Sequence, residues 1–207
     1  MLNTLSKTLL LLASLSLFGT ASAADHGEKK EHDHEHKQKS EAIQVKIETS
    51  QGDMTLELYP EKAPKTVKNF LRYVDEGFYN DTVFHRVIAN FMIQGGGFDK
   101  SYNRKATHDP VANEADNGLE NNYGSIAMAR TSDPDSATAQ FFINSSNNRF
   151  LNHTRKSRRG WGYCVFGKVI DGKAVIEKIS ALKTGSGGSF PKDVPSPQVI
   201  INKISRL

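Results

Sequence analysis

Two neighbouring runs of alternating apolar and polar residues constrain the fold of this chain most strongly. Every second residue is apolar in 43–47 and again in 54–58, and Gly52 lies in the short segment between them. Successive side chains of a β-strand point to opposite faces, so this period indicates strands that each bury one face. Two such runs around a glycine-containing turn predict a β-hairpin.

Further short segments have strand character and are bounded by turn residues. They span residues 83–88, 91–94, 125–129, 140–144, 163–169 and 198–204. Many short strands with few helices indicate a mainly β fold, either a closed antiparallel barrel or a sandwich, with helices packed outside. The periodicity does not distinguish the barrel from the sandwich.

Two stretches have the apolar spacing of α-helices. In residues 64–77, apolar side chains at positions 67, 70, 71 and 74 fall on one helical face. Pro64 suits a first helical turn, where its missing N–H costs nothing, and Gly77 is a typical residue after a helix end. A second, shorter helix is predicted over residues 173–182.

The N-terminus has the features of a secretory signal peptide over residues 1–23. Lys7 precedes an apolar stretch at 9–18, which is too short to span a bilayer, and small residues follow at 21–23. We expect cleavage after Ala23 and export, to the periplasm or beyond the cell, with no stable membrane insertion of the mature chain.

A polar tract over residues 24–40 separates this signal from the folded domain, which we place at 41–207. The tract has too few apolar residues to offset its ordering entropy, so we expect a flexible leader. Its histidines could bind Zn²⁺, Cu²⁺ or Ni²⁺ loosely, or the tract could be a solvated spacer, since nothing in it defines a metal geometry. These histidines are His26, His32, His34 and His36.

The composition of the chain argues against a disordered protein and against a membrane protein. A chain of 207 residues with 37% hydrophobic and 24% charged residues is an ordinary globular chain. Its net charge of +4 does not by itself call for nucleic acid as a partner. Cys164 is the single cysteine, so no internal disulfide can form, and its apolar neighbours predict a buried thiol rather than a nucleophile.

Three motifs carry a specific family resemblance. The segment 84–96 reads Phe-His-Arg-Val-Ile-Ala-Asn-Phe-Met-Ile-Gln-Gly-Gly, 139–143 reads Ala-Gln-Phe-Phe-Ile, and 165–169 reads Val-Phe-Gly-Lys-Val. Together they resemble the cyclophilin family of peptidyl-prolyl cis–trans isomerases, over nearly all of residues 43–207. The run Ile-Ala-Met-Ala-Arg-Thr at 126–131 resembles the bacterial periplasmic branch, in agreement with the signal peptide.

This resemblance implies a closed eight-stranded antiparallel barrel capped by two α-helices, with a peptide groove on its outer face. It also implies that Arg86 and Gln94 act on the reacting amide. The implied substrate-binding residues are Phe91, Met92, Ala129, Arg130, Gln140, Phe142, Phe150, Leu151 and Tyr163. The implied partners are proline-containing polypeptides, bound by a monomer that needs no cofactor.

The chemistry of prolyl isomerisation agrees with these residue types. Rotation about an amide breaks no covalent bond, so no nucleophile is required, and the catalyst must bind the twisted state better than the planar isomers. A permanently charged guanidinium such as that of Arg86 can hydrogen-bond the nitrogen lone pair that the twist releases. We expect His85 to be structural, because the reaction transfers no proton to a leaving group.

The chain departs from the family pattern at several positions. Phe150 stands where many eukaryotic members have a tryptophan that contacts cyclosporin, which predicts weak cyclosporin binding with activity retained. Arg130 replaces a common asparagine, and could either leave the groove unchanged or favour acidic substrates. Tyr163 stands near a common histidine position. The loop 153–162 is long and basic, and is either a solvated face or a docking patch for acidic chains or an anionic membrane.

Two other functions remain open at this stage. The groove could hold proline-containing segments as a binding module, with turnover incidental, and Arg86→Ala would distinguish this from catalysis. Alternatively, the histidines of 24–40 could handle metal ions, with the barrel as a passive carrier. Removal of residues 25–40 would then change metal affinity but not isomerase rate.

Overall fold

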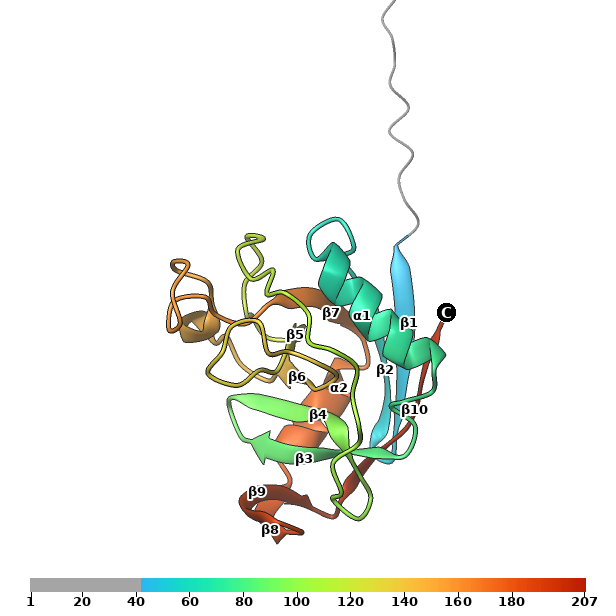
Figure 1. Ribbon diagram of the computed structural model, residues 1–207. Helices are drawn as coiled ribbons and strands as arrows, with labels where there is room; N and C mark the ends of the chain where they lie inside the picture. Colours follow the sequence, from blue (N-terminus) through green and yellow to red (C-terminus); the bar gives the residue numbers. More distant parts are fainter. Residues whose placement is uncertain (1–41) are drawn as a thin grey trace, which may run out of the picture. The chain divides into compact units, whose positions relative to one another are not determined.

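The computed structural model describes residues 42–207, which form a mainly β fold (Figure 1). Its helical elements are α1 (Pro64–Asp75), α2 (Lys173–Ser180) and the 3₁₀ turn η1 (Arg149–Leu151). Its strands are β1 (Ile43–Thr49), β2 (Gly52–Leu58), β3 (Thr82–Ile88), β4 (Met92–Asp99), β5 (Ser125–Met128), β6 (Phe141–Asn144), β7 (Val165–Asp171), β8 (Lys183–Gly187), β9 (Phe190–Ser196) and β10 (Val199–Arg206).

Eight of these strands close into an antiparallel barrel, so the barrel is confirmed over the sandwich. The order around the barrel is β1-β10-β3-β4-β6-β5-β7-β2. The predicted first hairpin is present, with Ile43 opposite Leu58 and Thr49 opposite Gly52. Closure leaves no unpaired barrel edge, which explains how such short strands make a stable sheet.

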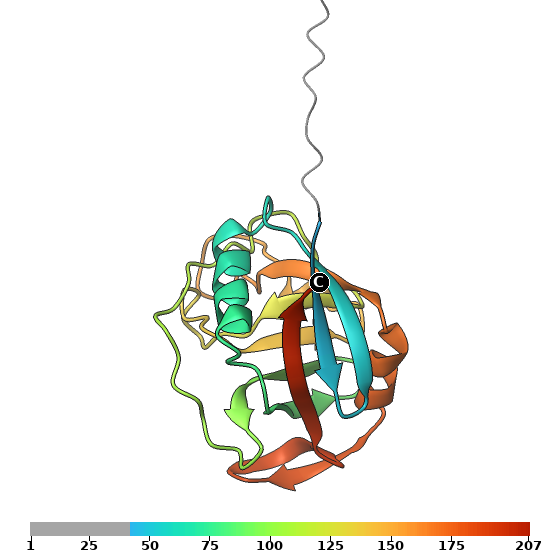
Figure 2. The same ribbon diagram turned by 90° about the vertical axis from the view of Figure 1, so that its right-hand side faces the viewer.

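The two predicted helices are both present and pack against the barrel by their apolar faces. The first buries Val67, Phe70, Leu71 and Val74 and ends at Asp75, two residues before Gly77. The second, α2, buries Ile176 and Ile179 and ends at Ser180, slightly before the predicted 182. Figure 2 shows α1 and α2 on opposite sides of the strands.

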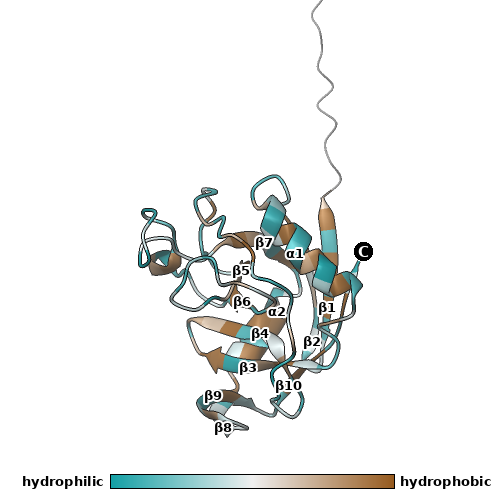
Figure 3. Ribbon diagram, viewed as in Figure 1, coloured by the Kyte–Doolittle hydropathy of each residue, from teal (hydrophilic) through white to brown (hydrophobic). Residues whose placement is uncertain are grey.

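The barrel separates two groups of buried apolar side chains. The larger fills the interior and the space beneath the helices, where Phe70, Phe141 and Phe166 are fully buried. The smaller lies on the outer side of β4, β5 and β6, around Met92 and Phe142. All four residues of β5 and of β6 are buried, because loops cover the outer face that a simple alternating strand would expose. Figure 3 shows the apolar strands within more hydrophilic connections.

The hairpin of β8 and β9 was not predicted from the sequence. Its first strand, Lys-Thr-Gly-Ser-Gly, has no apolar alternation, and its second contains two prolines. The hairpin forms a separate two-stranded sheet, and Phe190 anchors it against the ring of Phe98, with ring centroids 4.9 Å apart. Tertiary contact, rather than local periodicity, stabilises these strands.

Strand β4 is longer than the predicted 91–94. It starts at Met92 and continues through Gly95, Gly96 and Gly97 to Asp99. Glycine weakens a strand, so the sequence favoured an end at Gln94. In the structure these positions are crowded: a side chain at Gly96 would meet the rings of Phe141 and Tyr79 at 2.8 and 2.9 Å.

Three predictions fall on residues outside the described range. The signal peptide at 1–23, the leader at 24–40 and the metal-binding histidines His26, His32, His34 and His36 all precede residue 42. Within residues 42–207, neither helix is long and apolar enough to cross a membrane.

Candidate active site

A row of polar side chains crosses the outer face of β3 and β4 and continues to Gln140, the residue before β6. Arg86 on β3 is the register partner of Gln94 on β4, and its Nη1 donates a hydrogen bond to Gln94 Oε1 at 3.4 Å. Gln94 Nε2 in turn donates to Oε1 of Gln140 at 3.1 Å. The Arg86 side chain remains 43% exposed, so its guanidinium is oriented but still open to a ligand.

An apolar pocket of about 180 Å³ lies beside this row. Residues whose side chains point outward from β4 and β6 form its floor, and Met92 and Phe142 are 2% and 4% exposed. The lining residues are Arg86, Phe91, Met92, Gln94, Ala129, Arg130, Phe142, Leu151 and Tyr163. The site therefore combines a small, largely apolar pocket with two cations, Arg86 and Arg130, in its lining, an arrangement that suits an apolar ring beside a polar amide.

Arg130 and Tyr163 form a second wall of the pocket. The Arg130 guanidinium lies over the Tyr163 ring, 4.6 Å from its centroid. Its Nε donates to the carbonyl of Gly162 at 2.9 Å, and its Nη1 donates to the carbonyl of Thr131 at 2.9 Å. Arg130 is thus engaged with the protein's own backbone and braces Tyr163, which argues against a free side chain that reads acidic substrates.

Ala129 lies just beyond the end of β5, which stops at Met128. Its N–H donates to the carbonyl of Gln140 at 2.9 Å. The predicted strand 125–129 is therefore one residue too long, and the Ala129 N–H is already satisfied within the protein.

Phe150 does not line the pocket but extends it. Its side chain is 75% exposed, and its ring stacks on Phe91 with centroids 5.6 Å apart and an angle of 26° between the planes. Gln140 also does not line the pocket, but its side chain is joined to the site by the hydrogen bond from Gln94. Phe150 and Gln140 are the remaining members of the set of site residues predicted from the sequence. The structure brings all of them into one place.

Asp193 is a neighbour of Arg86 that the sequence did not reveal. Its Oδ2 lies 3.6 Å from Arg86 Nε, and its side chain is 23% exposed. Asp193 belongs to β9, the strand that sequence periodicity missed, and adopts a left-handed backbone conformation with φ of 65°. No local pattern marks such a residue, because its role depends on how the β8–β9 hairpin packs.

His85 precedes Arg86 but does not contribute to the pocket. It is 3% exposed and packs between the rings of Phe98 and Phe190, with centroids 4.6 and 5.2 Å away. Burial lowers the pKa of His85 to about 4. A neutral, enclosed imidazole fits the predicted structural role.

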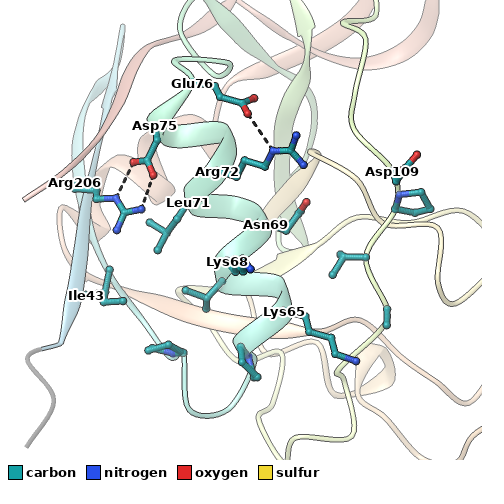
Figure 4. A pocket seen from close by; sticks show the side chains of 16 residues that line it. Ile43, Lys65, Lys68, Asn69, Leu71, Arg72, Asp75, Glu76, Asp109 and Arg206 are labelled. Atoms are coloured by element: carbon teal, nitrogen blue, oxygen red, sulfur yellow. Dashed lines mark hydrogen bonds and ion pairs between the residues drawn. The ribbon is translucent and has the colours of Figure 1, made fainter.

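Another cavity lies elsewhere, along α1 (Figure 4). It measures about 840 Å³ and is lined by residues such as Leu71, Arg72 and Asp75. Its charges are largely paired, for example Asp75 with Arg206 at 2.8 Å. It contains none of the predicted site residues, and we place the active site at the smaller pocket because polar and apolar groups converge there.

Within residues 42–207, no group of three His, Cys, Asp or Glu side chains is arranged to hold a metal ion. Cys164 is buried, and its Sγ lies 3.4 Å from Thr66 Oγ1. Burial raises the pKa of the Cys164 thiol to about 11, so this cysteine is a core residue and not a thiolate nucleophile.

Comparison with known proteins agrees with this geometry. The family model for "Cyclophilin type peptidyl-prolyl cis-trans isomerase/CLD" matches residues 44–206. Peptidyl-prolyl cis-trans isomerase B of Escherichia coli K12 is 54% identical over 161 residues, which cover 78% of this chain and 98% of that protein. Peptidyl-prolyl cis-trans isomerase A of Dickeya dadantii is 54% identical over 160 residues, which cover 77% of this chain and 82% of that one.

A solved structure shares the same architecture. The crystal structure of a Cryptosporidium parvum cyclophilin-type isomerase, determined in the presence of the dipeptide Ala-Pro, matches with a TM-score of 0.64 and 29% identity. The match covers 78% of this chain and 97% of that one.

Proposed function

This chain belongs to the cyclophilin-type peptidyl-prolyl cis–trans isomerase family, and we propose that its Arg86 assists rotation about X–Pro bonds of exported polypeptides. The observation that carries this proposal is the position of Arg86. Its guanidinium lies at the rim of an apolar pocket, held by Gln94 at 3.4 Å and still 43% exposed.

The barrier to be lowered is that of amide rotation, about 18–20 kcal/mol. It arises because the nitrogen lone pair is delocalised into the carbonyl, and rotation through 90° removes that delocalisation. At the twisted geometry the lone pair is localised on the prolyl nitrogen and can accept a hydrogen bond. A donor that engages this nitrogen only in the twisted state stabilises the transition state selectively.

Arg86 can supply that donor in a fixed orientation. Its Nη1 is directed by Gln94 and its Nε faces Asp193. No described residue hydrogen-bonds Nη2, which leaves donor capacity for a substrate. The guanidinium keeps its charge at any working pH, so no proton has to move.

The apolar pocket supplies the second requirement, a fixed proline ring. Met92, Phe142 and Leu151 line the pocket and are otherwise buried, so a proline ring would rest on apolar side chains that packing holds in place. With the ring held, rotation moves the acyl group that precedes it. A hundred-thousandfold acceleration requires only about 7 kcal/mol of differential stabilisation, which one charge-assisted contact and positioning can approach.

The experiment that tests this proposal compares Arg86→Ala and Arg86→Lys in an isomerisation assay with a proline tetrapeptide. We expect kcat/KM to fall about a hundredfold or more in Arg86→Ala, with peptide affinity nearly unchanged, and Arg86→Lys to recover only a fraction because it lacks the planar fork. If Arg86→Ala turned over at the normal rate, the apolar groove alone would be responsible, and the chain would act chiefly as a binding module.

We further propose that the substrates are proline-containing polypeptides outside the cytoplasm, in the periplasm, and that the working form is a monomer without a cofactor. The support for export is the apolar stretch and the small-residue cleavage site within residues 1–23, which lie outside the described residues. Cell fractionation with detection of a new N-terminus at Ala24 would test export, and size-exclusion chromatography with light scattering would test the monomer.

A further inference from the structure

The segment between β6 and β7 has an unusual charge. Residues 149–162, here called the basic loop, contain Arg149, Arg155, Lys156, Arg158 and Arg159, and no aspartate or glutamate. All of these side chains are exposed. Among residues 42–207, only Lys156 of this set forms an ion pair, with Asp116 at 2.9 Å. The four arginines therefore carry charge with no carboxylate partner in the described part of the chain.

The basic loop starts and ends at the pocket. Leu151 and Tyr163 both line it, and the Tyr163 N–H donates to the Leu151 carbonyl at 2.9 Å, which joins the two ends of the loop. Figure 1 shows the loop projecting from this point beyond η1. Arg155 follows Leu151 by four residues and Arg159 precedes Tyr163 by four, so chain length alone keeps their Cα atoms within about 14 Å of the pocket wall.

This distance matches the reach of a bound substrate. An extended peptide advances about 3.3 Å per residue, so residues roughly three to five positions from a proline in the pocket reach the basic loop. Phe150 provides a continuous surface between the two, because it is exposed and stacked on the pocket residue Phe91.

The basic loop is also folded rather than loosely extended. The N–H groups of Thr154 and Arg155 both donate to the Gly160 carbonyl, at 2.8 and 3.2 Å, and the Trp161 N–H donates to the Ser157 carbonyl at 2.9 Å. The ring of His153 packs against that of Trp161. A loop held by its own backbone presents its charges with less ordering cost on binding.

Nearby charges do not cancel this positive surface. Asp116 and Glu120 lie beside the base of the loop, in a hollow shared with Asn152 and His153. Asp116 already pairs with Lys156, and Glu120 accepts a hydrogen bond from Asn122 at 3.0 Å. Arg130, the other cation of this region, is bound to backbone carbonyls. The unpaired arginines of the loop are thus the groups available to an anionic ligand.

We propose that the basic loop is an extended substrate subsite that selects polypeptides with acidic residues a few positions from the isomerised proline. The inference rests on the proposed function of the pocket and adds a substrate class to it. Because these contacts are exposed, the attraction acts mainly on encounter and KM, and it weakens as salt shortens the Debye length from about 30 Å at 0.01 M to about 8 Å at 0.15 M.

The test uses peptides with one Ala-Pro core and three Glu, Gln or Lys residues placed three to five positions before or after the proline. At low salt we expect kcat/KM for a Glu peptide to exceed that of its Gln counterpart about tenfold, on one side of the proline at least, with kcat unchanged. The triple variant Arg155→Gln, Arg158→Gln, Arg159→Gln should lose this preference and keep normal turnover of the Gln peptide.

A matched control removes the same charge elsewhere. Lys62→Gln, Lys65→Gln, Lys68→Gln changes exposed cations at and before α1 and should retain the preference for Glu peptides. Equal kcat/KM for Glu and Gln peptides in the unmodified protein, or a preference that survives in the loop variant, would overturn the proposal. Failure to turn over even the Gln peptide would instead contradict the proposed isomerase function.

A vesicle-binding experiment tests the alternative that the basic loop binds an anionic membrane surface instead of a substrate. Vesicles of phosphatidylglycerol and phosphatidylcholine are titrated with the unmodified protein and with the loop variant. We expect no binding difference between the two proteins at 0.15 M salt. Vesicle binding that requires the loop arginines, without any preference for Glu peptides, would assign the loop to a membrane and overturn the substrate proposal.

Discussion

The carboxylate of Asp193 lies 3.6 Å from Nε of Arg86, so the guanidinium proposed to act in catalysis is oriented from two sides. Gln94 engages Nη1 from the neighbouring strand, whereas Asp193 comes from the separate β8–β9 hairpin. The hairpin therefore contributes to the site without lining its pocket.

This relationship predicts that Asp193→Asn lowers kcat while KM changes little. The variant keeps the shape of the side chain but removes the charge that attracts Nε, so Arg86 samples orientations that do not meet the twisted amide. A partly exposed ion pair is worth about 1 kcal/mol at most, which corresponds to roughly a fivefold loss of kcat. The Nε–H resonance of Arg86 in a ¹⁵N-correlated NMR spectrum should shift and broaden at the same time.

Two further variants separate positioning from general loss of structure. Asp193→Glu should recover part of kcat, because a carboxylate is restored near Nε, and Asp171→Asn, at the exposed C-terminal end of β7, should have no effect. An Asp193→Asn protein with normal kcat and an unchanged Arg86 resonance would show that the ion pair is incidental.

Substitution by alanine should have different consequences at Gly97 and at Gly96, two adjacent glycines of β4. A Cβ at Gly97 would lie 2.4 Å from Cγ of Gln140, so Gly97→Ala should turn Gln140 away and break its hydrogen bond with Gln94. We expect kcat/KM to fall severalfold while the free energy of unfolding changes by less than about 1 kcal/mol, since the displaced side chain is only half-buried.

Gly96→Ala is the matched comparison. Gly96 has φ of 77°, and its Cβ would press on the buried rings of Phe141 and Tyr79. Strain and overpacking together should destabilise the fold by roughly 3 kcal/mol, measured by urea denaturation. If Gly97→Ala destabilised the protein as much as Gly96→Ala does, the effect of Gly97→Ala on activity would not report on Gln140.

The exposed ring of Phe150 underlies a prediction about inhibitor binding. Phe150→Trp enlarges the aromatic surface next to Phe91 and adds an indole N–H donor, so cyclosporin should bind about tenfold more tightly, a gain of roughly 1.4 kcal/mol. Turnover of a proline tetrapeptide should change little, because Phe150 lies outside the pocket lining. Calorimetric titration measures the affinity, and nanomolar binding by the unmodified protein would contradict the premise.

The mainly β fold could be predicted from the alternating pattern of its strands, whereas the closed barrel followed only from the family resemblance, because periodicity does not distinguish a barrel from a sandwich. Alternation in 43–47 and 54–58 predicted the first hairpin, which the structure contains as β1 and β2. The β8–β9 hairpin could not be found this way, because its Phe190 ring packs against Phe98, His85 and Tyr102, which lie far away in sequence.

The candidate site shows the same difference between residues that are close in sequence and residues that only tertiary packing brings together. Arg86, Met92 and Gln94 lie close together in one β-hairpin, so their spacing in the sequence already carries their geometry. Asp193 reaches Arg86 only through the packing of the β8–β9 hairpin, and no spacing could indicate it. The engagement of Arg130 with backbone carbonyls was equally hidden, because a carbonyl acceptor has no sequence signature.

The buried imidazole of His85 predicts a defined dependence of stability on pH. Burial lowers the pKa of His85 to about 4, from 6.5. Between these values the unfolded chain binds a proton at this residue and the folded protein does not, so acid favours unfolding. His85 therefore contributes no penalty above pH 6.5, and its penalty grows to roughly 3 kcal/mol as pH falls to 4 and stays constant below that.

The variant His85→Phe removes this titration while it keeps an aromatic ring between Phe98 and Phe190. Unfolding free energies from urea denaturation at pH 7 and pH 4.5 give the loss of stability on acidification, and this loss should be smaller in His85→Phe than in the unmodified protein by about 2 kcal/mol. The difference between the two proteins cancels the titration of every other group. Because Phe is larger than His, His85→Gln serves as a second variant that should show the same reduced dependence. Identical pH dependence in all three proteins would mean that His85 becomes protonated in the folded state as easily as in the unfolded chain, contrary to its burial.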